Sequence, residues 1–172
     1  VPFIPEIPGL AESSFMTLRD IPDMDRIIEK IKTQKVRRAL VIGGGYIGIE
    51  IAENLAHLSI ETHVVEMAPQ ILAVFDPEMA GILHEKMTDH QVFIHAGETV
   101  SRIEGNPVSS VTLQSGTRLE ADLIIAAIGI RPQTALAKAA GLKLGPLGGI
   151  EVSDTLQTSD PDIYACGDAV ET

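Results

Sequence analysis

The sequence predicts an α/β fold: a doubly wound parallel sheet with helices on one face and a small antiparallel β-meander. The first observation is the stretch 39–66, ALVIGGGYIGIEIAENLAHLSIETHVVE, which reads as an apolar strand, a glycine turn, a helix and a second strand. The second is DLIIAAIGI at 122–130, a fully apolar run typical of a buried parallel strand. The third is the segment 99–119, where alternating apolar and polar residues between turn signals favour short antiparallel strands.

Local signals place the remaining elements in order. Three prolines and a glycine within 1–10 indicate an extended, irregular start. Asp76 as cap and Pro77 at the first helical position predict the start of a helix. The buried face of that helix is expected to consist of Met79, Ile82, Leu83 and Met87. The expected helices cover 22–33, the segment from the glycine turn to about 58, 77–90 and 135–140. The expected strands cover 15–18, 39–42, 62–65, 92–94, 100–103, 108–113, 117–119, 122–130, 150–152 and 163–165.

The glycine turn GGGYIG at 43–48 has the spacing and the context of a dinucleotide-binding fingerprint. Gly43 allows a tight turn, Gly45 lets a pyrophosphate approach the backbone, and Gly48 lets the helix pack closely on the sheet. The pyrophosphate would lie at the positive N-terminal end of that helix. Glu66, 18 residues past Gly48, can accept hydrogen bonds from ribose hydroxyls. The alternative is a glycine turn that only closes a βαβ unit.

Charge and composition limit the ligands and partners. The 172 residues carry a net charge of −11, which argues against nucleic acid as a partner. No Lys or Arg lies between Arg38 and Lys86, so nothing local neutralises a 2′-phosphate and NADH is expected to bind more tightly than NADPH. The longest uncharged apolar stretch, Ala39–Ile49, is too short to span a bilayer, and the five histidines have no metal-binding spacing. One cysteine, Cys166, excludes an internal disulfide and favours a cytoplasmic location.

Three ordered motifs carry a family resemblance: GGGYIGIE at 43–50, AAIGIRP at 126–132 and TSDPDIYACGDAVE at 158–171. With them the chain resembles the NAD(H)-binding domain, a Rossmann-like domain, of flavin-dependent pyridine nucleotide–disulfide oxidoreductases. It is most similar to the branch of NADH oxidase, NADH peroxidase and coenzyme A-disulfide reductase. The resemblance implies three parts: 1–18 as the end of the first FAD-domain half, 19–148 as the NAD(H)-binding domain, and 149–172 as the start of the second FAD-domain half.

The same resemblance implies cofactor contacts outside the glycine fingerprint. They fall on Tyr46, Ile47, Glu50, Ile128, Gly129, Gly167 and Asp168. Tyr46 would cover the flavin where the nicotinamide enters, Glu50 would lie near the nicotinamide, and Asp168 would bind the ribityl chain of the flavin. Structural roles compete with these: a helix-face aromatic for Tyr46, a solvated acid for Glu50, a turn residue for Gly129 and a helix cap for Asp168.

The implied activity is transfer of hydride from NADH to flavin and on to a cysteine or disulfide centre, as in coenzyme A-disulfide or persulfide reductases. NADH oxidase or peroxidase, the flavin reductase of an electron-transfer protein, and a non-catalytic NADH-sensing module are the alternatives. The cofactors would be NADH and, in the full-length protein, FAD. The redox cysteine is expected upstream, and Cys166 is expected to be a buried, inert thiol. The remaining FAD-domain half and a dimerisation domain of the same protein are the expected partners, with a homodimer as the assembly and without nucleic acid or membrane. The chain alone is expected to be inactive.

Overall fold

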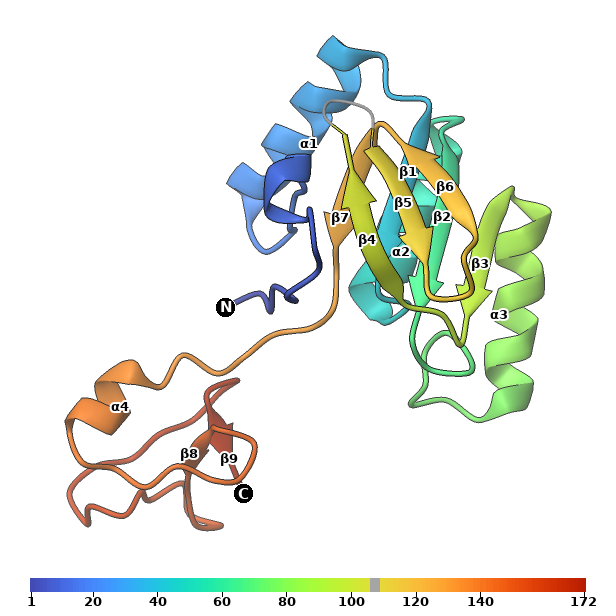
Figure 1. The fold of residues 1–172 in the computed structure, drawn as a ribbon. Helices are drawn as coiled ribbons and strands as arrows, with labels where there is room; N and C mark the ends of the chain where they lie inside the picture. The colour runs from blue at the N-terminus through green and yellow to red at the C-terminus, as the bar shows by residue number, and fades with distance from the viewer. Residues whose placement is uncertain (106–108) are drawn as a thin grey trace. The chain divides into compact units, whose positions relative to one another are not determined.

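A computed structural model describes residues 1–105 and 109–172 and divides them into two compact units. One unit is Pro2–Gly129, and the other is Val1 together with Ile130–Thr172. Figure 1 labels the helices and strands of each unit.

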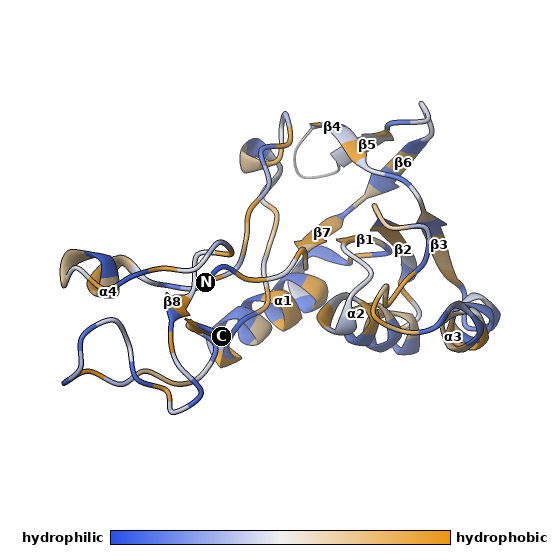
Figure 2. Cartoon of the chain, turned by 90° about the horizontal axis from the view of Figure 1, so that it is seen from below, coloured by the Kyte–Doolittle hydropathy of each residue, from blue (hydrophilic) through white to orange (hydrophobic). Residues whose placement is uncertain are grey.

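The centre of the unit Pro2–Gly129 is a four-stranded parallel sheet in the order β3-β2-β1-β7. Its strands are β1 (Arg38–Ile42), β2 (Glu61–Glu66), β3 (Val92–Ala96) and β7 (Leu123–Ala126). Its helices are α1 (Ile21–Gln34), α2 (Tyr46–His57) and α3 (Pro77–Asp89), preceded by the 3₁₀ turn η1 (Ala11–Ser13). Figure 2 shows α1, α2 and α3 on one face of the sheet, as the sequence predicts.

An antiparallel meander covers the opposite face of the sheet. It consists of β4 (Val100–Glu104), β5 (Ser109–Leu113) and β6 (Arg118–Ala121). The predicted antiparallel strands are therefore present. The expected strand start at Val108 and most of the preceding turn lie outside the described residues. The α/β class with helices on one face and a meander is confirmed.

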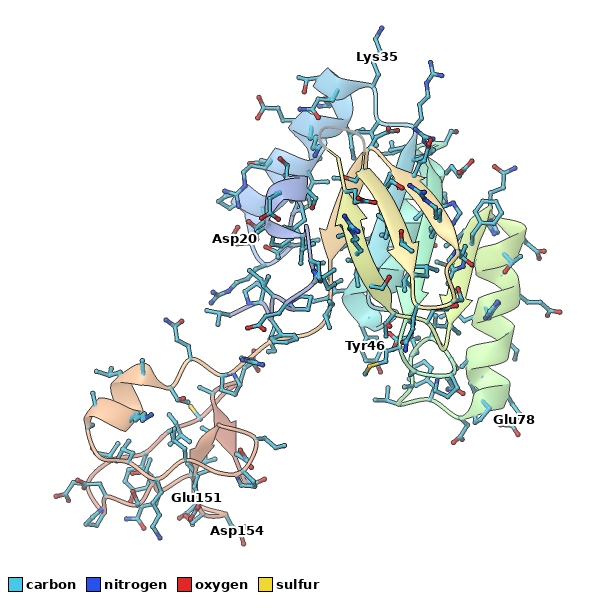
Figure 3. All side chains as sticks on the ribbon, in the orientation of Figure 1. Asp20, Lys35, Tyr46, Glu78, Glu151 and Asp154 are labelled. Atoms are coloured by element: carbon cyan, nitrogen blue, oxygen red, sulfur yellow. The ribbon has the colours of Figure 1, made fainter. Side chains whose placement is uncertain are left out.

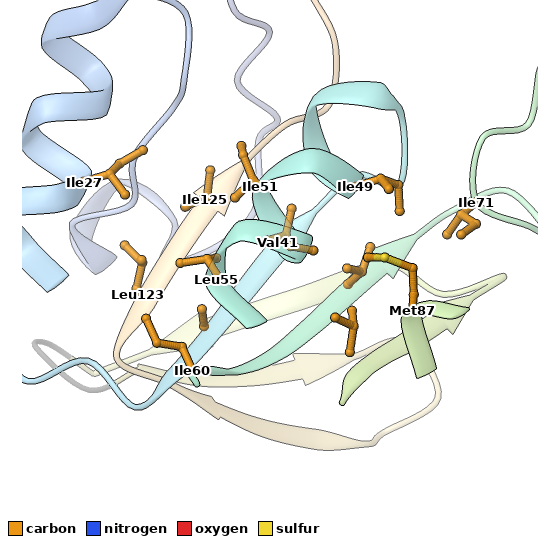
Figure 4. Packing of buried hydrophobic residues seen from close by; sticks show 14 of the residues in the cluster. Ile27, Val41, Ile49, Ile51, Leu55, Ile60, Ile71, Met87, Leu123 and Ile125 are labelled. Carbon is orange, nitrogen blue, oxygen red and sulfur yellow. The ribbon is translucent and has the colours of Figure 1, made fainter. Parts of the chain in front are cut away.

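The two layers explain why β1 and β7, the strands that hold Val41 and Ile125, are apolar at nearly every position. Successive side chains of a strand point to opposite faces. Val41 and Ile125 pack with the helices (Figure 4), while their neighbours Leu40 and Ile124 pack with the meander. Since both faces are covered, both sets are buried, and the resulting apolar runs are those from which the sheet was predicted.

The predicted strand at 15–18 is reduced to a single parallel bridge. The Met16 N–H donates to the Ile124 carbonyl at 2.9 Å, and the Ala126 N–H donates to the Met16 carbonyl at 2.8 Å. The chain that precedes this bridge reaches the meander, because the Ile103 N–H donates to the Pro8 carbonyl at 2.9 Å. The N-terminal segment is thus attached to both layers of this unit.

Helix α3 has a narrower buried stripe than its sequence predicts. Met87 is buried, but Met79 and Ile82 are 59% and 56% exposed, and Ala80 is buried instead. The cause is the position of α3 beside β3, the edge strand of the sheet, where only one side of the helix meets other elements (Figure 2). Asp76 is the N-cap, as predicted, but its side chain makes no capping hydrogen bond.

The unit formed by Val1 and Ile130–Thr172 contains α4 (Ala135–Ala139) and a parallel pair of two-residue strands, β8 (Ile150–Glu151) and β9 (Val170–Glu171). The strand expected at 163–165 is only a bridge between Tyr164 and Gln157. Cys166 is exposed, so the prediction of a buried thiol is wrong. Few apolar side chains surround this segment, which leaves the thiol without a core to enter.

Candidate functional site

The carboxyl ends of β1, β2 and β7 meet at the glycine turn. The Gly43 N–H donates to the Val65 carbonyl at 2.8 Å, and the Ala127 N–H donates to the Ile42 carbonyl at 2.8 Å. Gly43 has a φ of +107°, a conformation that side chains disfavour, and an added Cβ would lie 2.4 Å from the Ala127 carbonyl oxygen. The turn therefore fits between the ends of two neighbouring strands only as glycine.

The other two fingerprint glycines occupy opposite environments. A Cβ on Gly48 would lie 1.9 Å from the Gly43 carbonyl oxygen, so the first turn of α2 rests directly on the glycine turn. A Cβ on Gly45 would meet nothing within 4 Å, and Gly45 has an ordinary φ of −77°. Gly48 thus serves the packing of the helix, whereas Gly45 leaves open space at the surface of the turn.

The N-terminus of α2 faces this open space. Gly45 is its N-cap, and no side chain caps the helix there. The first N–H groups of a helix lack partners within the helix and carry a partial positive charge, so this end can bind an anion. Tyr46 and Ile47 are 59% and 47% exposed on the first turn, and Glu50 is exposed on the next (Figure 3 labels Tyr46).

Glu66, at the end of β2, is held by two backbone donors. Its Oε2 accepts the Gly44 N–H at 2.6 Å, and its Oε1 accepts the Ala68 N–H at 2.7 Å. These bonds fix a half-buried carboxylate beside the glycine turn. Each carboxylate oxygen has a further lone pair with which to accept a hydroxyl hydrogen.

The loop between β2 and α3 completes the site, and no sequence motif predicts its conformation. The Leu72 N–H donates to the Gly44 carbonyl at 2.8 Å, and Ile71 beside it is fully buried. Leu72 has a φ of +46°, an uncommon value for a bulky residue. The loop then brings Phe75 to Tyr46, with ring centroids 5.9 Å apart and planes at 80°.

The remaining predicted contacts are divided between the two units. Ile128 and Gly129 follow β7; Ile128 packs on the meander core, and Gly129, with a φ of +95°, accepts the Phe3 N–H at 2.9 Å. Gly167 and Asp168 belong to the other unit, where Gly167 has a φ of +93° and Asp168 is exposed. The structure therefore brings together Gly43 to Glu50 and Glu66, and it places Gly167 and Asp168 in a separate unit.

A second acidic residue, Glu98, is bonded through its backbone to the end of β2. The Glu98 N–H donates to the Glu66 backbone carbonyl at 3.0 Å, and hydrogen bonding from Ser115 lowers the pKa of the Glu98 carboxyl.

Within residues 1–105 and 109–172, no group of three or more His, Cys, Asp or Glu side chains is arranged to hold a metal ion. None of the helices in the described part of the chain is long and apolar enough to cross a bilayer.

The fold and this site together define a dinucleotide-binding α/β domain. The model of one protein family, pyridine nucleotide-disulphide oxidoreductase, matches residues 1–172. The chain belongs to this family.

Curated relatives differ in the reactions for which they are named. The chain is 38% identical over 169 residues to the nitrite reductase [NAD(P)H] large subunit of Klebsiella oxytoca, covering 97% of this chain and 18% of that protein. It is 37% identical over 171 residues to an NADH oxidase of Methanocaldococcus jannaschii, covering 99% and 38%. It is 35% identical over 172 residues to an NAD(P)H coenzyme A polysulfide/persulfide reductase of Pyrococcus horikoshii, covering 99% and 38%. The chain thus spans well under half the length of these relatives.

Solved structures share the fold over nearly the whole chain. Reduced CoADR-RHD of Bacillus anthracis superposes with a TM-score of 0.94 at 47% identity, covering 99% of this chain and 30% of that one. The water-forming NADH oxidase of Lactobacillus brevis, bound to NADH, superposes with a TM-score of 0.91 at 29% identity, covering 99% and 37%.

Proposed function

We propose that this chain is the NADH-binding part of an FAD-dependent oxidoreductase that passes hydride from NADH to flavin and on to a cysteine or disulfide centre. The observation that carries the proposal is the uncapped N-terminus of α2, with open space at Gly45 and the Glu66 carboxylate at the adjacent strand end. An anion-binding helix end beside a hydroxyl acceptor matches the pyrophosphate and the adenosine ribose of a dinucleotide.

Each part of NADH has a group to bind it. The pyrophosphate would accept hydrogen bonds from the first N–H groups of α2, and it would approach the backbone at Gly45. The ribose hydroxyls would donate to Glu66. The nicotinamide would extend toward the exposed face of α2 that carries Tyr46 and Glu50, with Ile128 and Gly129 after β7 along its path.

When bound, the flavin would supply the redox chemistry, as the acceptor of a hydride (a proton with two electrons) from NADH, which would leave as NAD⁺. In this chain the flavin contacts would come from Gly167 and the exposed Asp168 carboxylate, which is free to accept a hydroxyl hydrogen from the ribityl chain. We infer that the rest of the FAD site, the redox cysteine and a dimerisation domain belong to other parts of the same protein. The relatives' greater length supports this inference.

A coenzyme A-disulfide or persulfide is the acceptor that we propose. Support comes from the 47% identity to CoADR-RHD, which exceeds the identity to the NADH oxidase of L. brevis. Direct reduction of oxygen is the second candidate, supported by the similarity to the NADH oxidase of M. jannaschii. NADH consumption by the full-length protein, measured with coenzyme A disulfide, a persulfide or oxygen alone, distinguishes these acceptors.

Cofactor preference tests the binding site itself. Glu66 repels a 2′-phosphate and accepts from a free ribose hydroxyl, so NADH should bind at least about tenfold more tightly than NADPH, a difference of ~1.4 kcal/mol. Glu66→Ala should weaken NADH binding and reduce the difference in affinity between NADH and NADPH. Titration with NADH and with NADPH, each followed by the fluorescence of its reduced nicotinamide, gives the dissociation constants.

Glu53→Ala, at an acid farther along α2, is the matched control and should leave the ratio unchanged. Equal or tighter binding of NADPH by the unmodified chain would contradict the proposed site.

A further inference from the structure

The ring of Phe75 is the only aromatic neighbour that the described structure gives Tyr46. The two rings meet edge to face, with centroids 5.9 Å apart. Both side chains are partly exposed, Tyr46 at 59% and Phe75 at 40%, so this contact is not part of the hydrophobic core. A pair that adds little to the core can still fix the direction in which one of its members points.

Phe75 is held in place by its backbone. Its N–H donates to the Leu72 carbonyl at 2.8 Å, and its carbonyl accepts the Gln70 Nε2 at 2.9 Å. Leu72 in turn donates its N–H to the Gly44 carbonyl at 2.8 Å. A short chain of hydrogen bonds thus connects Phe75 to the glycine turn.

Two buried side chains also hold this loop in place. Ile71 is fully buried and Leu72 is 7% exposed, and both belong to the core on the helix face of the sheet. An added Cβ on Gly44 would lie 3.0 Å from the Ile71 side chain, so the loop and the glycine turn are in close contact. The position of Phe75 is therefore set by the fold and not by its own exposed ring.

We propose that Phe75 is a positioning residue for Tyr46, which it holds across the nicotinamide entrance until NADH displaces it. The proposal rests on the proposed function, because Tyr46 has an entrance to cover only if NADH binds beside it. The Phe75 ring touches no cofactor in this scheme and acts through Tyr46 alone. An edge-to-face pair of this kind favours the covered arrangement by about two- to tenfold.

The first measurement detects the contact without any cofactor. The chain has two tyrosines, Tyr46 and Tyr164, so a ¹³C-tyrosine spectrum contains two sets of ring signals, which Tyr164→Phe assigns. Phe75→Leu removes the ring current and should shift the Tyr46 signals. Val74→Ala changes the neighbouring residue, which is 76% exposed, and serves as the matched control that should leave them in place.

The second measurement uses the full-length, flavin-loaded protein. Tyr46→Ala should speed the oxidation of reduced flavin by oxygen, and Phe75→Leu should speed it by about two- to tenfold. In the double variant Tyr46→Ala/Phe75→Leu, the second change should add nothing. An unchanged thermal midpoint of Phe75→Leu shows that the variant remains folded.

The outcomes distinguish the covering role of Tyr46 from the positioning role of Phe75. If Tyr46→Ala leaves the oxygen reaction unchanged, the covering role that the family resemblance implies for Tyr46 is wrong, and the positioning role of Phe75 is overturned with it. If Tyr46→Ala speeds the reaction but Phe75→Leu does not, or acts equally in both backgrounds, the positioning role is overturned while the proposed function stands. Unshifted Tyr46 signals in Phe75→Leu also overturn it.

Discussion

At the scale of single residues, one added methyl group should have opposite effects at two glycines of the same turn. Gly48→Ala places a Cβ 1.9 Å from the Gly43 carbonyl oxygen, so the helix or the turn must shift. We expect a loss of about 1–3 kcal/mol in the free energy of unfolding. Gly45→Ala meets nothing within 4 Å and should keep the stability but weaken NADH binding, because the methyl group occupies the space proposed for the pyrophosphate.

Thermal unfolding and NADH titration of both variants test this contrast. Equal stability of Gly48→Ala and the unmodified chain would show that α2 does not rest on the turn. Undiminished NADH affinity in Gly45→Ala would place the pyrophosphate elsewhere.

His95 gives the stability a dependence on pH. Burial and the neighbouring His63, whose Nδ1 lies 3.0 Å from the His95 Nε2, lower the pKa of His95 below its ordinary value of 6.5, while Glu98 opposes the shift. The unfolded chain therefore takes up the proton first, and stability falls as the pH drops below about 6.5. Above that pH His95 is neutral in the folded and the unfolded chain, and this loss of stability is absent.

We expect the thermal midpoint to decrease as the pH is lowered from about 8 to about 5. The decrease should be smaller in His95→Gln than in the unmodified chain. His57→Gln, at an exposed histidine at the end of α2, is the control. Identical pH profiles for His95→Gln and the unmodified chain would remove His95 as the cause.

At the scale of elements, two helices begin with an aspartate but differ in what the side chain does. The Asp20 carboxylate accepts the Asp23 N–H at 2.9 Å, and the Asp23 carboxylate accepts the Arg19 N–H at 2.8 Å, so the start of α1 is capped on both sides. Asp76 makes no such bond at the start of α3. Asp20→Ala should cost about 1 kcal/mol of stability, and Asp76→Ala clearly less.

Chemical denaturation measures both values in the same chain. The reverse order of the two losses would mean that charge at the helix dipole, and not the capping hydrogen bond, sets the contribution of these residues.

The elements also show where prediction from sequence reaches its limit. The strands around Val41 and Ile125 were predictable because burial on both faces requires an apolar residue at every position. The position of Phe75 was not, because it depends on a hydrogen bond between Leu72 and Gly44, which are far apart in sequence. The exposure of Met79 had no sequence signal either, since the helical period is the same at the edge of a sheet as at its centre.

At the scale of the whole molecule, the two units differ in how much core they contain. In Val1 and Ile130–Thr172 the buried apolar side chains are Ala137 and Val152, whereas two hydrophobic clusters fill Pro2–Gly129. The predicted nucleotide contacts fall in the larger unit, and the predicted flavin contacts of Gly167 and Asp168 fall in the smaller one. The chain alone should therefore bind NADH while holding no flavin and turning over no substrate.

Fluorescence titration with NADH, together with the visible absorbance of the purified chain after incubation with FAD, measures both properties. A yellow protein, or oxidation of NADH by the chain alone with an added acceptor, would show that the site is more complete than we propose. Faster amide hydrogen exchange in the smaller unit would follow from its smaller core.

The hydrogen bonds of Glu66 have a consequence for anyone who redesigns the enzyme to use NADPH. The carboxylate that we propose to exclude the extra phosphate is also the acceptor for the Gly44 and Ala68 N–H groups. Replacing it with a small or basic residue changes the cofactor and at the same time releases the loop that carries Phe75. A redesign that starts at Glu66 therefore needs a second substitution that supplies a new acceptor for these amides, or the gain in NADPH affinity will come with a loosened entrance.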